Sequence, residues 1–68
     1  MKTGVVSLFI EDKGYGFIKP DDKSKDVFFH LNELRKINLE TILKGTKISF
    51  EIREDKSKRI HAFNLKLI

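Results

Sequence analysis

The chain has 68 residues and no cysteine, and its 14 Lys and Arg against 10 Asp and Glu give a formal net charge of +4. A chain of this length forms one domain with a small core, burying only about 60% of its unfolded surface. We therefore assign residues 1–68 to a single domain. The missing cysteines exclude disulfides and thiolate metal sites, and no apolar run approaches the ~20 residues of a membrane-spanning helix. A basic charge favours polyanionic partners such as nucleic acids, although solubility alone would also explain it.

Three strand-like segments occupy the first half of the chain. Residues 5–10 are apolar and β-branched, residues 14–19 run up to the strand-stopping Pro20, and residues 26–31 alternate with period two. In the third segment one side is wholly apolar and is expected to face the core, namely Val27, Phe29 and Leu31. Asp26, Phe28 and His30 then face outward.

The orientation of the second segment is ambiguous from its pattern. One face carries Tyr15, Phe17 and Lys19, and the other carries Gly16 and Ile18. Because Gly16 offers no core volume, the pattern alone favours aromatic side chains inside. The alternative is that Gly16 lets a strongly bent strand pack closely.

The second half of the chain begins with a different pattern. Residues 31–44 predict a short helical turn, capped by Asn32, and then a long loop, with one helix of about 12 residues as the competing interpretation. Residues 47–54 and 59–67 predict two further strands. The first sets Ile48, Phe50 and Ile52 on one side against Lys47, Ser49, Glu51 and Arg53 on the other. The end of the last strand sets Phe63, Leu65 and Leu67 against Ala62, Asn64 and Lys66. Five short strands favour a small barrel, which leaves no open edges.

The functional signal lies in two short segments, Lys-Gly-Tyr-Gly-Phe-Ile at residues 13–18 and Asp-Val-Phe-Phe-His at residues 26–30. Their alternation can place four flat side chains on adjacent strands of one surface: Tyr15, Phe17, Phe28 and His30. Unpaired nucleobases stack on such side chains when they lie on a basic domain. The two segments therefore indicate binding of single-stranded RNA or DNA.

Over essentially its whole length the chain resembles bacterial cold-shock proteins. The matching residues are Gly4, Val5, Val6, Phe9, the two segments above, Gly45, residues 49–52, Ala62, Asn64 and Leu65. The resemblance implies a five-stranded antiparallel OB-fold barrel, all-β, with the helical turn and long loop between the third and fourth strands. It also implies stacking roles for Tyr15, Phe17, Phe28 and His30. Lys13 would contact phosphate, and Asp26 would accept a hydrogen bond from a base edge.

Several positions depart from the pattern of that family. Leucines stand where the family usually has aromatic residues, so Leu8, Leu31 and Leu39 are expected to form a weaker, apolar part of the platform. Ser7 replaces the usual lysine. Lys58 and Arg59 lie in a loop about one residue longer than the usual one, and we expect them to contact phosphates, with mere solvation of loop charges as the alternative.

The sequence contains no arrangement typical of an enzyme. Asp26 and His30 lie roughly 13 Å apart on one strand, too far for a catalytic pair, and no cluster has the spacing of metal ligands. Gly14 and Gly16 lack the remainder of a nucleotide-binding fingerprint. We expect no catalysis, no cofactor, no metal and no small-molecule substrate.

Together these observations predict a small, monomeric, cytoplasmic protein that binds single-stranded RNA or DNA without catalysis. By competing with hairpin formation it would act as a nucleic-acid chaperone, and the resemblance implies a role in adjusting transcription or translation during stress. Two alternatives are an OB-fold protein-interaction module and a charge-driven, ribosome-associated factor. Both would bind nucleic acid more weakly through the aromatic residues.

Overall fold

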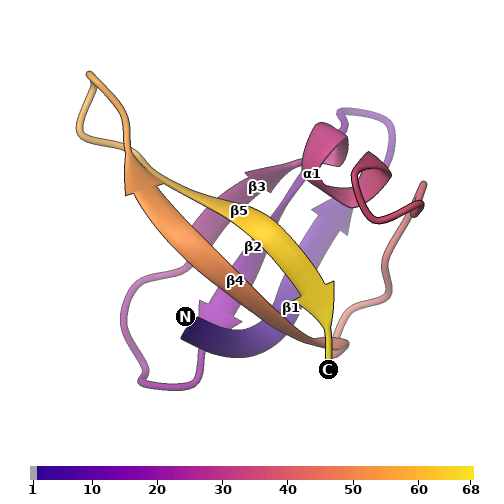
Figure 1. Ribbon diagram of the computed structural model, residues 1–68, viewed down its shortest axis with the longest axis horizontal. Coiled ribbons are helices and arrows are strands. Elements are labelled where there is room, and N and C mark those ends of the chain that lie inside the picture. Colours follow the sequence, from indigo (N-terminus) through magenta and orange to yellow (C-terminus); the bar gives the residue numbers. More distant parts are fainter. Residues whose placement is uncertain (1) are drawn as a thin grey trace.

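The computed structural model describes residues 2–68, which form a five-stranded β-barrel with one short helix (Figure 1). The elements are β1 (Lys2–Ile10), β2 (Tyr15–Pro20), β3 (Val27–His30), α1 (Leu31–Arg35), β4 (Lys47–Glu54) and β5 (Ile60–Leu67). The barrel closes in the strand order β1-β2-β3-β5-β4. The predicted all-β OB-fold barrel with a helical turn after the third strand is therefore confirmed. Within residues 2–68 there is no helix with the length and apolar character needed to cross a membrane.

Four of the strand contacts are antiparallel, as expected: β1 with β2, β1 with β4, β2 with β3, and β4 with β5. The contact that joins β3 to β5 is parallel, and its one aligned pair is Phe28 with His61. The parallel direction follows from the other pairings. β4 is antiparallel to β1 and β5 is antiparallel to β4, so β5 runs in the same direction as β1 and β3. This closure places residues of β3, in the middle of the chain, beside residues of β5, near its C-terminal end.

The core fills the barrel and one of its ends. Its buried members are Val6, Ile18, Val27, Phe29, Leu34, Ile42, Ile48, Phe50, Ala62 and Leu65. The inward side predicted for the third segment is confirmed for Val27 and Phe29, whereas Leu31 is only partly buried against this core. Leu34 is fully buried, so α1 closes the barrel beyond the end of β3.

The orientation of β2 depends on a close contact at Gly16. Gly16 and Ile18 are buried, and Tyr15 and Phe17 lie on the outer surface, half-exposed. Phe29 is paired with Gly16 on β3, and a Cβ atom at Gly16 would lie 2.8 Å from the Cζ atom of the Phe29 ring. Phe29 therefore occupies the volume that glycine leaves, which makes the interpretation with inward aromatic residues wrong.

A Gly16→Ala substitution is expected to lower the free energy of unfolding by about 1–3 kcal/mol, the usual cost of overpacking. The added methyl group would also lie 2.5 Å from the backbone oxygen of Leu8, so β1 and Phe29 must both move. Urea denaturation measures the loss. In a Phe29→Leu background, Gly16→Ala should lower the free energy of unfolding by less, because the phenylalanine ring that the methyl group meets is gone. If the losses from the two substitutions simply added, this explanation would be contradicted.

The alternation predicted for the last strand is wrong beyond Phe63. Asn64 adopts a φ of 52°, and the register between β4 and β5 shifts between Ser49 and Glu51. Such a bulge inserts one extra residue and reverses the side on which later side chains lie. As a result Ala62 and Leu65 both face the core, and Phe63 lies half-exposed on the other side of β5. Leu67, the last residue of β5, is 55% exposed.

Ile52 lies on the apolar side of β4 with Ile48 and Phe50, but it is 40% exposed, whereas those two residues are buried. In Figure 1 the tip of the β4–β5 hairpin projects from the barrel, at the upper left of the view. Ile60, at the start of β5 on the same projecting hairpin, is also exposed. The apolar side of β4 is therefore buried within the barrel and exposed on the projecting hairpin.

The helical segment is short, which confirms the turn-plus-loop interpretation of residues 31–44. The prediction that Asn32 caps it is wrong, because Asn32 lies inside α1. The N-cap is His30, whose Nδ1 accepts a hydrogen bond from the backbone N–H of Asn32 over 3.1 Å. β3 leads directly into α1, so the last residue with extended backbone occupies the capping position.

Candidate nucleic-acid interface

Three aromatic rings cluster on the outer surface of β2 and β3, and we call them the aromatic platform: Tyr15, Phe17 and Phe28. The ring centroid of Phe28 lies 5.4 Å from that of Tyr15 and 6.0 Å from that of Phe17. The centroids of Tyr15 and Phe17 are 6.1 Å apart. The antiparallel pairing of Phe17 with Phe28 sets this spacing, since directly paired side chains share one face of the sheet. All three rings are half-exposed, so part of each remains available for a ligand.

His30 lies beside the platform but is held by its capping role. It is paired with Tyr15 and is exposed. Because its Nδ1 accepts the hydrogen bond from Asn32, the neutral ring carries its proton on Nε2. The predicted stacking residue can therefore present an N–H donor as well as a ring face.

His61 is a fourth ring at the platform that sequence reasoning did not select. Its centroid lies 5.2 Å from that of Phe28, with the two rings nearly perpendicular at 83°. Its Nε2 lies 2.8 Å from an oxygen of Asp55. The contact arises from the parallel bridge between β3 and β5, which joins strands that are not consecutive, so no local sequence signal could have revealed it.

A groove of about 510 Å³ adjoins the platform. Phe17, Phe28 and His61 contribute rings to it, and its other lining residues are Lys25, Asp26, Lys58, Arg59 and Ile60. Lys58 and Arg59, predicted as phosphate contacts, thus lie next to the platform together with Lys25, which was not predicted. Three cations beside aromatic rings form a site in which a phosphate and a base could be bound together.

Asp55 organises the loop that carries Lys58 and Arg59. Its carboxylate accepts hydrogen bonds from the backbone N–H of Ser57 at 2.8 Å and of Arg59 at 3.0 Å. The bond from Arg59 and the contact with His61 hold the pKa of Asp55 below its usual value. The carboxylate therefore stays ionised and ties the basic loop to the ring of His61.

Asp26, the predicted base-edge acceptor, lies exposed at the rim of the groove. The Ser7 hydroxyl is 3.3 Å from a carboxylate oxygen of Asp26 and 3.3 Å from the backbone oxygen of Phe17. A hydroxyl has one proton, so it can donate to one of these oxygens at a time. The side chain at position 7 therefore contacts this carboxylate through a hydroxyl and carries no positive charge.

The remaining predicted residues lie at the margins of the platform. Lys13 is exposed in the turn between β1 and β2, and Leu8 is 45% exposed and directly paired with Phe17. Leu31 and Leu39 both pack partly against the core, so only a part of each side chain faces solvent. Of the three leucines, Leu8 is therefore the best placed to extend the platform.

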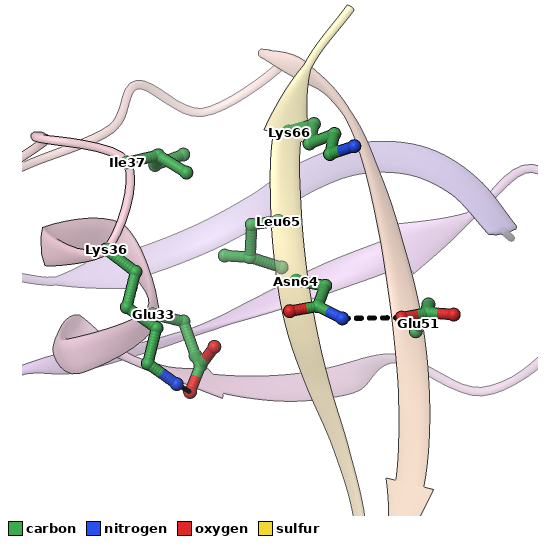
Figure 2. Close-up of a pocket in the computed structure, with 7 residues that line it drawn as sticks. All are labelled: Glu33, Lys36, Ile37, Glu51, Asn64, Leu65 and Lys66. Atoms are coloured by element: carbon green, nitrogen blue, oxygen red, sulfur yellow. Dashed lines mark hydrogen bonds and ion pairs between the residues drawn. The ribbon is translucent and has the colours of Figure 1, made fainter.

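A second groove, of about 390 Å³, lies between α1 and the strands β4 and β5 (Figure 2). Figure 2 shows the Lys36–Glu33 ion pair beside α1, and Asn64 directed across to Glu51. The lining contains no aromatic ring, and its two carboxylates and two ammonium groups balance in charge. These properties do not favour base stacking or phosphate binding.

The comparisons with known proteins agree with this architecture. The family model of the 'Cold-shock' DNA-binding domain matches residues 2–68. The chain is 46% identical over 66 residues to the "Probable cold shock protein" of Sinorhizobium fredii, covering 96% of each chain. It is 37% identical over 67 residues to a cold shock protein of Rhizobium meliloti, covering 97% of each. A cold shock-like protein of Escherichia coli is 48% identical over 50 residues, which is 74% of this chain and 70% of that protein. The chain therefore belongs to the cold-shock domain family.

Proposed function

We propose that the protein binds single-stranded RNA or DNA without catalysis, by stacking unpaired bases on the aromatic platform. The observation that carries this proposal is the cluster of three half-exposed rings beside a groove with three cations. Base faces stack on aromatic side chains with little sequence preference, and cations neutralise the backbone phosphates. In this assignment Tyr15, Phe17, Phe28 and His30 contact bases. Lys13, Lys58 and Arg59 contact phosphates, and Asp26 accepts a hydrogen bond from a base edge.

The biological role follows from competition between this binding and base pairing. A protein that captures unpaired bases disfavours hairpins, and so acts as an RNA chaperone or as a regulator of transcription or translation. The relatives named for cold shock support a role in the response to stress. We propose that the protein acts as a monomer in the cytoplasm, a reducing compartment that suits a chain without cysteine.

The test is a titration of labelled oligo-U and oligo-dT against a duplex of the same length, at two salt concentrations. Tyr15 is the only tyrosine and the chain has no tryptophan, so its emission reports on the platform. We expect preference for single strands and a change in Tyr15 emission. With the three proposed phosphate contacts, the logarithm of affinity should fall with a slope of about −2 against the logarithm of salt concentration. Equal affinity for duplex with unchanged emission would contradict the proposal.

A charge-driven mode is the second candidate, favoured by Lys25, Lys58 and Arg59 lining one groove. It would give a steep salt dependence and little effect of substitutions in the platform. The same titration, repeated with a platform variant, separates the two modes.

A Leu8→Trp substitution is expected to tighten binding of single strands about three- to tenfold. Leu8 is exposed and paired with Phe17, so an aromatic side chain there adds one ring to the platform. The new tryptophan emission would respond to the ligand. Leu67→Trp is the matched control, because Leu67 is exposed outside the platform and the groove; equal gains from both variants would contradict a positional effect.

A further inference from the structure

A row of directly paired residues runs around the outside of the barrel. Leu8 is paired with Phe17, Phe17 with Phe28, Phe28 with His61, and His61 with Arg53. Directly paired side chains project from the same face of a sheet, and each of these residues is half-exposed or exposed. The outer surface of the platform is therefore continuous across β5 to β4.

At the Arg53 end of this row, a guanidinium and an aromatic ring form a surface on which a base could stack. The guanidinium carbon of Arg53 lies 4.7 Å from the ring centroid of Phe63. Phe63 is half-exposed and lies two residues after His61, on the same side of β5. A guanidinium held over an aromatic ring is a planar cation, which can stack on a base or form paired hydrogen bonds with a phosphate.

We propose that Arg53, His61 and Phe63 form a second contact surface for the same single strand, which we call the β5–β4 extension. This inference rests on the proposed function. A strand that lies on Phe17 and Phe28 continues over His61 to the guanidinium of Arg53, with Lys58 and Arg59 beside its path in the groove. The binding track is thereby displaced toward β4, away from the β1 edge where Leu8 offers no aromatic face.

The charges around the extension are compatible with a polyanion. Asp55 already accepts hydrogen bonds from the loop and from His61, and Glu51 accepts one from Asn64 at 2.6 Å. Glu54 is exposed at the end of β4 and remains a local negative charge. The basic side chains of Arg53, Lys58 and Arg59 offset it.

The extension implies a specific length dependence. Neighbouring strands are about 4.8 Å apart, so the two steps from Phe28 to Arg53 span about 10 Å. At ~3.4 Å per stacked nucleotide this is two to three nucleotides. Affinity should therefore keep rising for roughly two to three nucleotides beyond the length that saturates the platform.

The experiment measures affinities for oligo-dT of increasing length with the full chain and its Arg53→Ala, Arg53→Lys and His61→Ala variants. We expect Arg53→Ala to weaken binding of the long oligonucleotides about three- to tenfold and to leave the shortest ones unaffected. Arg53→Lys should recover only part of the loss, because it keeps the charge without the planar face. Lys47→Ala removes a charge near the opposite end of β4 and should leave the length dependence unchanged.

The outcomes separate this inference from the proposed function. If Phe28→Ala weakens binding at every length while the Arg53 and His61 variants match the wild type, the extension is wrong and the platform stands. If the wild type binds no single strand, both proposals are overturned. Arg53 is exposed on the barrel surface, so its variants should fold, and circular dichroism checks this.

Discussion

Replacing Phe29 with alanine is expected to lower the free energy of unfolding by about 3–5 kcal/mol, the usual cost of truncating a buried phenylalanine. Phe29 has no solvent exposure, and its ring stacks on Phe9 with centroids 5.8 Å apart and planes within 10°. Gly16, the residue paired with Phe29 on β2, has no side chain that could fill the cavity left behind. A domain of this size has a total stability of roughly 3–10 kcal/mol, so the substitution should remove about a third of that stability or more.

Urea denaturation followed by circular dichroism measures this loss. Phe28→Ala is the matched control, since Phe28 is the neighbouring phenylalanine and its ring lies half-exposed on the opposite face. Phe29→Leu should lose less than Phe29→Ala, because leucine fills more of the space. If the Phe28 and Phe29 alanine variants were equally stable, the assignment of the two faces of β3 would be wrong.

Phe28→Ala is expected to weaken binding of single-stranded oligonucleotides about tenfold or more, at ~1–3 kcal/mol per lost stack. Phe28 lies at the centre of the site, with its ring centroid within 6.0 Å of those of Tyr15, Phe17 and His61. Removing the Phe28 ring would leave a gap between the three neighbouring rings, so they would no longer form one continuous stacking surface. The effect should appear at every oligonucleotide length and persist at high salt, because stacking does not depend on released counterions.

The measurement is a fluorescence anisotropy titration at two salt concentrations, with Leu67→Ala as a control for loss of an exposed apolar side chain. Phe28→Leu separates stacking from general hydrophobic contact, since leucine retains apolar area but lacks a π-face. We expect it to bind nearly as weakly as Phe28→Ala. A folded Phe28→Ala variant with wild-type affinity would exclude base stacking on the platform and favour the charge-driven mode.

The prediction of the strands succeeded because strand patterns are local. The alternation of residues 26–31 correctly assigned Val27 and Phe29 to the core, and the five expected strands are present within residues 2–68. The two segments that carry the platform were likewise recognisable, since their aromatic residues lie at fixed spacing in the chain. Their assigned roles in binding remain predictions.

The sequence by itself determined the strands and placed Phe28 on the outer side of the third one, because both depend on periodicity within a few residues. The tertiary structure decided what depends on contacts between distant segments. Phe29 fills the space at Gly16 from a neighbouring strand, which turns Tyr15 and Phe17 outward. The parallel closure of β3 with β5 places His61 against Phe28 and Arg53 beyond it. No periodicity within one segment specifies which residue of another strand lies opposite it, so the continuous outer row could be found only in the folded barrel.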